Sequence, residues 1–385
     1  MLPFALAFAM LGTPASAQDF HSLWIVPKKT QIAEATPIGA GTVTRGERSW
    51  DFSIPVGRIP AGSYIEWDFA ILAKSSAPEF YAVEYFDRGR WQVKDTIKCT
   101  LTDDTTKEVT HELMTIKLED AIGRGNLQLR LRAVSDGKGL CHFRYADDTA
   151  ASVRYLGTEA PSDTTRVLCI GNSFTYVAGA SFMLKEIAWS QGHYLDMQDA
   201  LKGGQTFGQH LALSVTADKI GQGGYDYVFF QNQSQTNAWY WQDRKGNARI
   251  LADAVELAGR VRECSPEAKM IFEYTWAYPG KDNGGFSSFA EFDKFLAKGT
   301  KKIAKAAKGS VSPIGKAFAL CRMERPDIIL YADDDKHQSG YGAYLKACVN
   351  YLVLFGKPFT ADAQNCSLDP DKAAYLRQLA ETVVL

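Results

Sequence analysis

The feature that most constrains the fold of this 385-residue chain is a change in the spacing of its apolar residues near residue 160. Before that point apolar and polar residues alternate, as in Tyr64–Phe69 and Leu127–Arg132. This period of two buries one face of a β-strand. The run Asp87–Arg90, which contains a glycine, lies between two such stretches and predicts a hairpin connection. Short strands between turns indicate an all-β sandwich over residues 18–157.

After a Pro- and Ser-containing segment, residues 158–165, which we interpret as a linker, the pattern changes. Short apolar runs now alternate with segments of helical periodicity, among them a helix over 341–355 opened by Ser339. The runs that predict buried strands are Val167–Ile170, Tyr225–Phe230, Met270–Tyr274 and Ile328–Tyr331. Such alternation predicts an α/β domain over residues 166–385, with a parallel sheet covered by helices on both faces. Active sites in these sheets lie at the carboxyl ends of the strands.

The start of the chain indicates export. The apolar run Leu2–Leu11 is followed by the small residues Ala15-Ser16-Ala17, a pattern typical of a secretory signal peptide comprising residues 1–17. The run is too short to span a bilayer. We therefore expect a periplasmic or secreted bacterial protein without a membrane span.

Composition excludes some classes of function. The chain has 43 Lys and Arg against 44 Asp and Glu, a balance that argues against a nucleic-acid-binding protein. None of its seven cysteines forms a C-x-x-C pair, so we predict no zinc or redox motif, and the odd number leaves at least one free thiol in a monomer.

Two loops carry candidate catalytic residues. Ser173 follows Gly171 and Asn172 at the end of the first α/β strand, where a hydroxyl would be exposed near a helix start. In the second loop, Asp334 precedes His337 by three residues and can reach Nδ1, which would leave Nε2 for a serine. Each loop taken alone is also compatible with a turn, a helix cap or a solvated acidic segment. We find no cluster of further ligands that would complete a metal site.

Two more polar loops could stabilise an oxyanion. Gly204 lies just before a predicted helix and would offer a backbone N–H group. The run Gln231–Gln235 follows the Tyr225–Phe230 strand and would offer side-chain amides. His210, on the helix after Gly204, is expected to be a packed or helix-surface histidine.

Taken in order, these four loops resemble the conserved blocks of the SGNH hydrolase (GDSL-type esterase) superfamily, over about residues 166–358. The resemblance implies a three-layer, flavodoxin-like fold and no cofactor. It assigns the nucleophile to Ser173, its base to His337 and the orienting carboxylate to Asp334. The implied oxyanion donors are Ser173, Gly204 and, because the usual Gly-x-Asn-Asp block is replaced by a Gln-rich run, either Gln233 or Gln235.

The expected substrate is an acetylated glycan or another small ester. Aromatic residues with polar tips suit sugar faces, and Trp239, Tyr240 and Trp276 follow the predicted strand ends; packing in the core is the alternative for each. The β-sandwich weakly resembles the jelly-roll modules attached to carbohydrate-active enzymes. We thus predict an exported carbohydrate O-acetylesterase. A lipase or thioesterase, and a glycan-binding protein with a degenerate hydrolase domain, remain alternatives.

Overall fold

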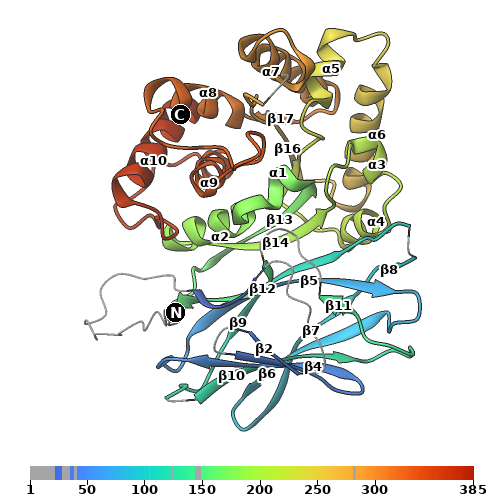
Figure 1. Cartoon of the computed structure of the whole chain (residues 1–385), viewed down its shortest axis with the longest axis vertical. Helices are drawn as coiled ribbons and strands as arrows, with labels where there is room; N and C mark the ends of the chain where they lie inside the picture. Colours follow the sequence, from blue (N-terminus) through green and yellow to red (C-terminus); the bar gives the residue numbers. More distant parts are fainter. Residues whose placement is uncertain are drawn as a thin grey trace, which may run out of the picture.

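The computed structural model describes residues 22–27, 35–38, 41–103, 105–123, 125–143, 149–280 and 283–385. The proposed signal peptide, residues 1–17, lies outside these residues. In Figure 1 the chain forms a β-rich lower half and a helix-rich upper half. No helix within the described ranges is long and apolar enough to cross a membrane.

The lower half is a sandwich of two sheets. Its strands are β1 (Ser22–Pro27), β2 (Ala35–Ile38), β3 (Gly41–Arg45), β4 (Ser49–Val56), β5 (Tyr64–Lys74), β6 (Phe80–Asp87), β7 (Arg90–Lys98), β8 (Leu101–Thr102), β9 (Thr110–Lys117), β10 (Gly125–Ala133), β11 (His142–Phe143) and β12 (Thr149–Gly157). One sheet has the order β2-β3-β4-β10-β6-β7, and β1-β12-β5-β9 begins the other.

The alternation seen in the sequence gives the sandwich its core. Leu127, Leu129 and Leu131 of β10 are fully buried and pack in one apolar cluster with Trp67 of the opposite sheet. The predicted hairpin is confirmed: β6 and β7 pair through Asp87↔Arg90, with positive φ angles at the two residues between them. Positive φ at both positions matches the twist of the flanking strands. The jelly-roll connectivity stays a prediction.

The upper half is a parallel α/β unit. Its elements are β13 (Asp163–Gly171), α1 (Ser173–Tyr176), a 3-10 turn (Val177–Gly179), α2 (Ala180–Ser190), β14 (His193–Leu201), α3 (Phe207–His210), α4 (Ser214–Gln222), β15 (Tyr227–Phe230), α5 (Thr236–Gln242), α6 (Ala248–Cys264), β16 (Lys269–Glu273), a 3-10 turn (Asn283–Gly285), α7 (Phe289–Ala306), β17 (Ser310–Ser312), α8 (Ile314–Glu324), α9 (Gly340–Phe355) and α10 (Pro370–Val384).

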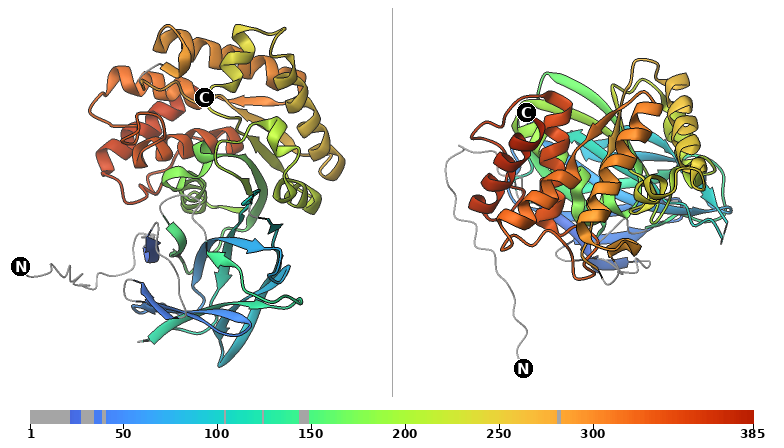
Figure 2. Two further views of the ribbon diagram at one scale, coloured as in Figure 1. Left: turned by 45° about the vertical axis from the view of Figure 1, so that its right-hand side comes forward. Right: turned by 90° about the horizontal axis from the view of Figure 1, so that it is seen from above.

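Successive residues of the central strands point to opposite faces of the sheet. The strand order is β14-β13-β15-β16-β17, and all four pairings are parallel. Val167 of β13 packs in the core with α2, α8, α9 and α10, whereas Leu168 packs in a second core with α6. The sheet therefore lies between two helical layers, as the near-continuous apolar strands predict. Figure 2 shows these layers from two further directions.

The two halves share a sheet, which the sequence pattern does not indicate. β9 of the sandwich pairs antiparallel with β14 of the α/β unit at His111↔Asp199, so one sheet runs from β1 to β17. Buried charges line this junction. Among the described residues, the buried or partly buried ion pairs that cross it include Glu66–Lys185, Glu112–Lys219, Arg154–Glu186 and His111–Asp199.

Two expectations need correction. The apolar run Ile328–Tyr331 is not a strand; it is a loop with the bridge Tyr331↔Gln338, in which Ile328 and Leu330 are buried and Ile329 is exposed. The expected linker, residues 158–165, overlaps β13, which begins at Asp163 because its first residues pair with β14. All seven cysteines are unpaired.

Candidate active site

The turn after β13 presents Ser173 at the start of α1. Asn172 caps this helix, since its side-chain oxygen accepts a hydrogen bond from the Phe174 N–H at 3.2 Å. A side chain at Gly171 would not fit, because its Cβ would lie 2.5 Å from the Thr175 hydroxyl oxygen and 2.8 Å from Gln231 Oε1. Glycine at this position thus lets the chain turn tightly from strand to helix.

Ser173, His337 and Asp334 form a hydrogen-bonded chain, although 164 residues separate the serine from the histidine. Ser173 Oγ lies 2.8 Å from His337 Nε2, and His337 Nδ1 lies 2.5 Å from Asp334 Oδ2. The other oxygen, Asp334 Oδ1, accepts hydrogen bonds from the backbone N–H groups of Lys336 and His337 at 3.1 and 2.9 Å. The structure brings together the three residues that the sequence singles out for acyl transfer.

The electrostatics of Asp334 suit a residue that orients an imidazole. Partial burial alone would raise the pKa of its carboxyl, but the hydrogen bonds from His337 and Lys336 lower it below the ordinary value. The carboxylate is therefore charged at neutral pH. Because it faces Nδ1, it favours the tautomer with the proton on Nδ1 and leaves Nε2 as the acceptor for the Ser173 hydroxyl.

Trp276 packs in the core and does not contact substrate, which corrects the sequence-based interpretation. Its side chain is 0% exposed and stacks between the rings of Phe174 and Phe318, with centroids 4.5 and 4.4 Å away. Its indole N–H donates to the Lys336 carbonyl at 3.0 Å. The ring thus packs against Phe174 in the nucleophile turn, and its N–H group holds the loop that carries His337.

The other two predicted aromatic contacts differ from each other. Tyr240 is 5% exposed and belongs to the core between the sheet and α6, so its burial contradicts the predicted role in substrate binding. Trp239, its neighbour on α5, is 40% exposed and stays a candidate contact for substrate. Adjacent helical residues point in different directions, which the sequence alone could not resolve for this seven-residue helix.

The candidate oxyanion donors lie in loops that close around the Ser173 turn. Gly204 has a φ of 72°, a conformation that favours glycine, and the Asn172 side chain ties this loop to the Ser173 turn by donating to the Gln205 carbonyl at 2.9 Å. The side-chain amide of Gln233 donates hydrogen bonds to Ser234 Oγ and Gln235 Oε1 within its own loop.

Gln235 instead lines a pocket of about 420 Å³ beside the triad. The pocket is polar and aromatic, and it opens between the loops that follow β15 and β16 and the loop that carries the acid and base. Its lining residues are Gln235, Tyr278, Gly280, Gly284, Gly285, Asp334 and Lys336. Burial raises the pKa of the Tyr278 hydroxyl to about 12, so this group stays protonated and can donate a hydrogen bond.

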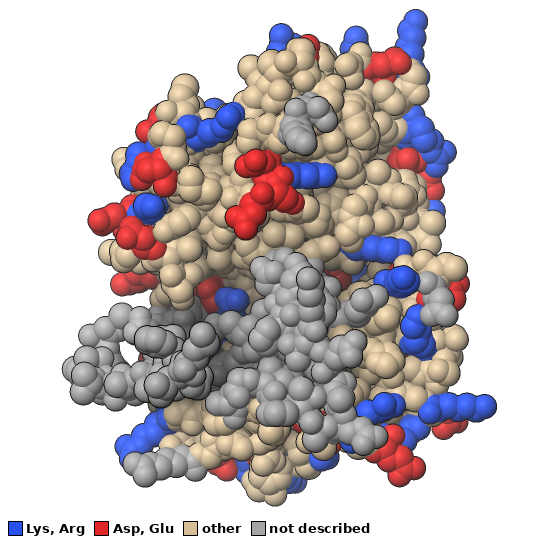
Figure 3. Space-filling view, in the orientation of Figure 1, with Lys and Arg blue, Asp and Glu red and all other residues tan. Residues whose placement is uncertain are grey.

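The face drawn in Figure 3 mixes both signs of charge, with acidic side chains gathered near its centre.

Two residues, Gln231 and His210, hold the Ser173 turn by hydrogen bonds that the sequence pattern does not indicate. Gln231 Oε1 accepts hydrogen bonds from the Asn172 N–H at 2.8 Å and the Thr175 hydroxyl at 3.1 Å. His210 is buried, as expected of a packed histidine, and its Nε2 lies 3.0 Å from the Gly171 carbonyl. Burial lowers the pKa of His210 to about 4, so the ring is neutral and donates to that carbonyl.

No group of three or more His, Cys, Asp or Glu side chains that could hold a metal ion occurs in the described part of the chain.

Comparisons with known proteins found similarity at the level of structure. No protein-family model matches the sequence, and no curated protein matches it. A DUF4886 family protein from Bacteroides uniformis is similar over 57% of this chain and 94% of its own, with 19% identity and a TM-score of 0.51.

Two further solved structures are similar at lower TM-scores. A protein from Slackia heliotrinireducens that is proposed to be an SGNH hydrolase has 22% identity and a TM-score of 0.41, over 50% of this chain and 100% of its own. Axe2, an acetylxylan esterase from Geobacillus stearothermophilus, has 16% identity and a TM-score of 0.38, over 52% of this chain and 97% of its own.

Proposed function

We propose that the α/β unit of this protein is an SGNH-type hydrolase and that the protein is a serine esterase that removes O-acetyl or other short acyl groups from carbohydrate. The observation that carries the proposal is the hydrogen-bonded chain from Ser173 Oγ through His337 to Asp334. A nucleophile, a base and a group that orients the base are the parts that acyl transfer to a hydroxyl requires.

The mechanism follows from this geometry. Ser173 Oγ attacks the ester carbonyl while His337 Nε2 takes its proton, and Asp334 stabilises the imidazolium that forms. The backbone N–H groups of Ser173 and Gly204, with the amide of Gln235, stabilise the negatively charged oxygen; one such donor is worth roughly 2.7–4 kcal/mol. Gln235 is favoured over Gln233 because it lines the pocket, whereas the Gln233 amide is engaged within its loop.

The imidazolium then returns the proton to the leaving alcohol, and the acyl group stays on Ser173 as an ester. In the second half of the reaction His337 takes a proton from water, which attacks the acyl-enzyme and releases acetate and the free serine. No step of this sequence needs a metal ion or an organic cofactor.

The pocket supports a short acyl group on a hydrophilic alcohol. Its lining combines amide, phenol, ammonium and glycine backbone groups beside the triad, which suits a sugar hydroxyl better than a lipid chain. The exposed Trp239 ring offers an apolar face for a sugar. We further propose export through residues 1–17; mass spectrometry of protein recovered outside the cytoplasm should find Gln18 at its N-terminus, and an intact N-terminus there would refute this step.

The test is hydrolysis by the wild-type protein and Ser173→Ala. We expect acetate release from acetylated xylooligosaccharides, and activity on 4-nitrophenyl acetate that falls sharply with the octanoate. Ser173→Ala should lose at least about a thousandfold in turnover with an unchanged unfolding midpoint. Equal turnover by the variant would remove Ser173 from the mechanism, and a preference for octanoate would indicate a lipase instead.

A further inference from the structure

The helix that carries Ser173 is very short, and its carbonyl end needs partners. α1 comprises only four residues, and the chain leaves helical geometry at Ala178, where φ is 55°. The last carbonyl groups of a helix have no partner within it. Two side chains supply donors here: Lys346 Nζ lies 2.9 Å from the Phe174 carbonyl, and Gln338 Nε2 lies 3.3 and 2.7 Å from the carbonyls of Phe174 and Val177.

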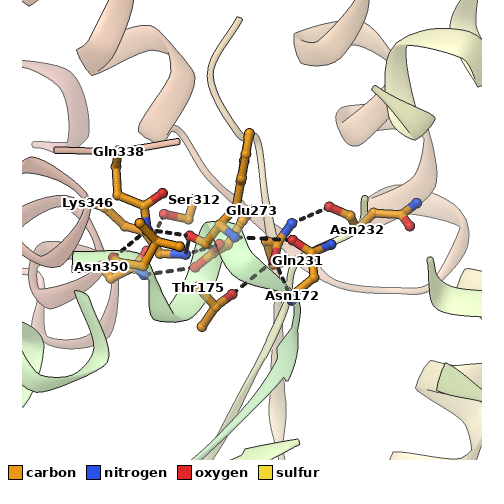
Figure 4. A network of polar contacts seen from close by, with 11 residues as sticks. Asn172, Thr175, Gln231, Asn232, Glu273, Ser312, Gln338, Lys346 and Asn350 are labelled. Carbon is orange, nitrogen blue, oxygen red and sulfur yellow. Dashed lines mark hydrogen bonds and ion pairs between the residues drawn. The ribbon is translucent and has the colours of Figure 1, made fainter. Parts of the chain in front are cut away.

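Lys346 belongs to a buried network that continues away from the site, drawn in Figure 4. Its ammonium forms an ion pair with Glu273 at 2.6 Å, and both side chains are at most 3% exposed. The other Glu273 oxygen accepts from Asn350 at 2.9 Å, and Asn350 in turn accepts from the Ser312 hydroxyl at 2.7 Å. The network thus links β16, β17 and α9 to the turn that holds the nucleophile.

Stability alone is a poor explanation for a buried ion pair at this position. Burying two charges costs several kcal/mol each, and a well-packed apolar pair of similar volume is often as stable or more stable. What an apolar side chain could not provide is the hydrogen bond to the Phe174 carbonyl. This bond acts on the residue next to Ser173, and Gln338, which shares the acceptor, is the residue next to His337.

We propose that Lys346 and Gln338 are positioning residues that set the distance between the nucleophile and its base. They tie the α1 turn to the segment that runs from His337 into α9, so that the 2.8 Å contact between Ser173 Oγ and His337 Nε2 is built into the fold before substrate binds. Loss of this tie lets the turn shift and lengthens the contact. Misplacement of reacting groups by about 1 Å can cost roughly a hundredfold in rate. The assignment rests on the proposed esterase function.

Three variants separate positioning from stability. Lys346→Met leaves Glu273 charged and unpaired, so this variant should unfold more easily or fail to fold. The double variant Lys346→Met/Glu273→Gln removes both charges, while the amide oxygen introduced in place of the carboxylate can still accept from Asn350. Ser312→Ala is the matched control, since it removes the buried hydrogen bond from Ser312 of β17 to Asn350, at the end of the network away from the Phe174 carbonyl.

The measurements are kcat and KM for 4-nitrophenyl acetate and the midpoint of urea unfolding. For the double variant we expect a midpoint near that of the wild type, a kcat lower by at least about tenfold and a KM within about threefold. Ser312→Ala should lower the midpoint and keep kcat within about twofold. A double variant with wild-type kcat would overturn the proposal, as would an equal loss of kcat in Ser312→Ala.

A second readout keeps this inference separate from the esterase proposal. If the wild type hydrolyses no ester, the proposed function fails, and crystal structures of the wild type and the double variant then decide the positioning role. A Ser173 Oγ to His337 Nε2 distance beyond 3.5 Å in the variant alone would support the role. An unchanged distance would refute it.

Discussion

Replacing Asp334 with asparagine should reduce turnover about a thousandfold, and the hydrogen bonds of the carboxylate give the size of the loss. In the structure one oxygen accepts two backbone N–H groups and the other faces His337 Nδ1. An asparagine that keeps its oxygen on the backbone N–H groups turns its NH₂ toward Nδ1. The proton then moves to Nε2, and the ring can no longer accept the proton of Ser173.

The orientation that allows catalysis, with the amide oxygen of the asparagine toward His337 Nδ1, loses two hydrogen bonds. If the amide flips, its NH₂ faces the two backbone donors, and because the Asp334 side chain is 48% exposed we assign each lost bond only about 1 kcal/mol. Loss of the charge-assisted bond to the imidazolium costs roughly 2 kcal/mol more. The total of about 4 kcal/mol corresponds to about a thousandfold, since each 1.36 kcal/mol is a factor of ten.

The assay compares kcat/KM for 4-nitrophenyl acetate in the wild type, Asp334→Asn and Asp335→Asn. The neighbouring Asp335 is the matched control, because it lies in the same exposed loop and its side chain forms no hydrogen bond or ion pair with His337 in the described structure. We expect Asp335→Asn to stay within about twofold of the wild type. Activity of Asp334→Asn within tenfold of the wild type, or equal losses at both positions, would refute this account of the triad.

Three further predictions concern buried groups around the site. Burial lowers the pKa of His210 from 6.5 to about 4, so this residue stabilises the fold above pH 6.5 and loses that contribution as the pH falls toward 4. The free energy of unfolding by urea should therefore differ less between the wild type and His210→Gln at pH 4 than at pH 7.5, by about 3 kcal/mol. An unchanged difference would contradict this prediction. Burial alone would lower the pKa of His111, but two aspartates raise it to about 10, so its contribution to stability is complete below pH 6.5 and is lost as the pH rises toward 10. The free energy of unfolding should therefore differ less between the wild type and His111→Gln at pH 9.5 than below pH 6.5. A larger difference at pH 9.5 would show that the ring is neutral. Trp276→Phe keeps an aromatic ring but loses the bond to the Lys336 carbonyl, so kcat should fall several-fold while the folded state loses about 1–2 kcal/mol; an unchanged kcat would show that the indole only fills space.

Part of the site could be predicted because the Ser173 loop follows β13, one of the parallel strands whose carboxyl ends meet at one edge of the sheet. The loop with Asp334 and His337 follows a segment that is not a strand, so its place beside Ser173 is predicted from the order of the motifs and not from the sheet. The position of strand ends also located the loops of Gly204 and the glutamines, which follow β14 and β15, but it could not decide which amide lines the pocket.

The missed features depend on contacts that leave little trace in a local pattern. A tryptophan after a strand gives the same sequence signal whether it faces substrate or packs between two rings, as Trp276 does. In the run Ile328–Tyr331, Ile328 and Leu330 are buried and Ile329 is exposed, and four apolar residues alone do not separate a strand from a loop. Lys346 did carry a signal, since a lysine within the otherwise apolar stretch Ala343–Val349 must find a partner when the helix is buried all round.

The sheet shared by the two halves determines how this protein can be handled. A shortened protein that starts at residue 158 would lack the oppositely charged partners of Lys185, Lys219 and Asp199. It would also expose the edge of β14 that pairs with β9. A bare edge of that kind recruits strands from other chains, so we expect the trimmed protein to precipitate. The sandwich therefore belongs to the same sheet as the α/β unit, and we expect that an expressed form of this protein needs both halves.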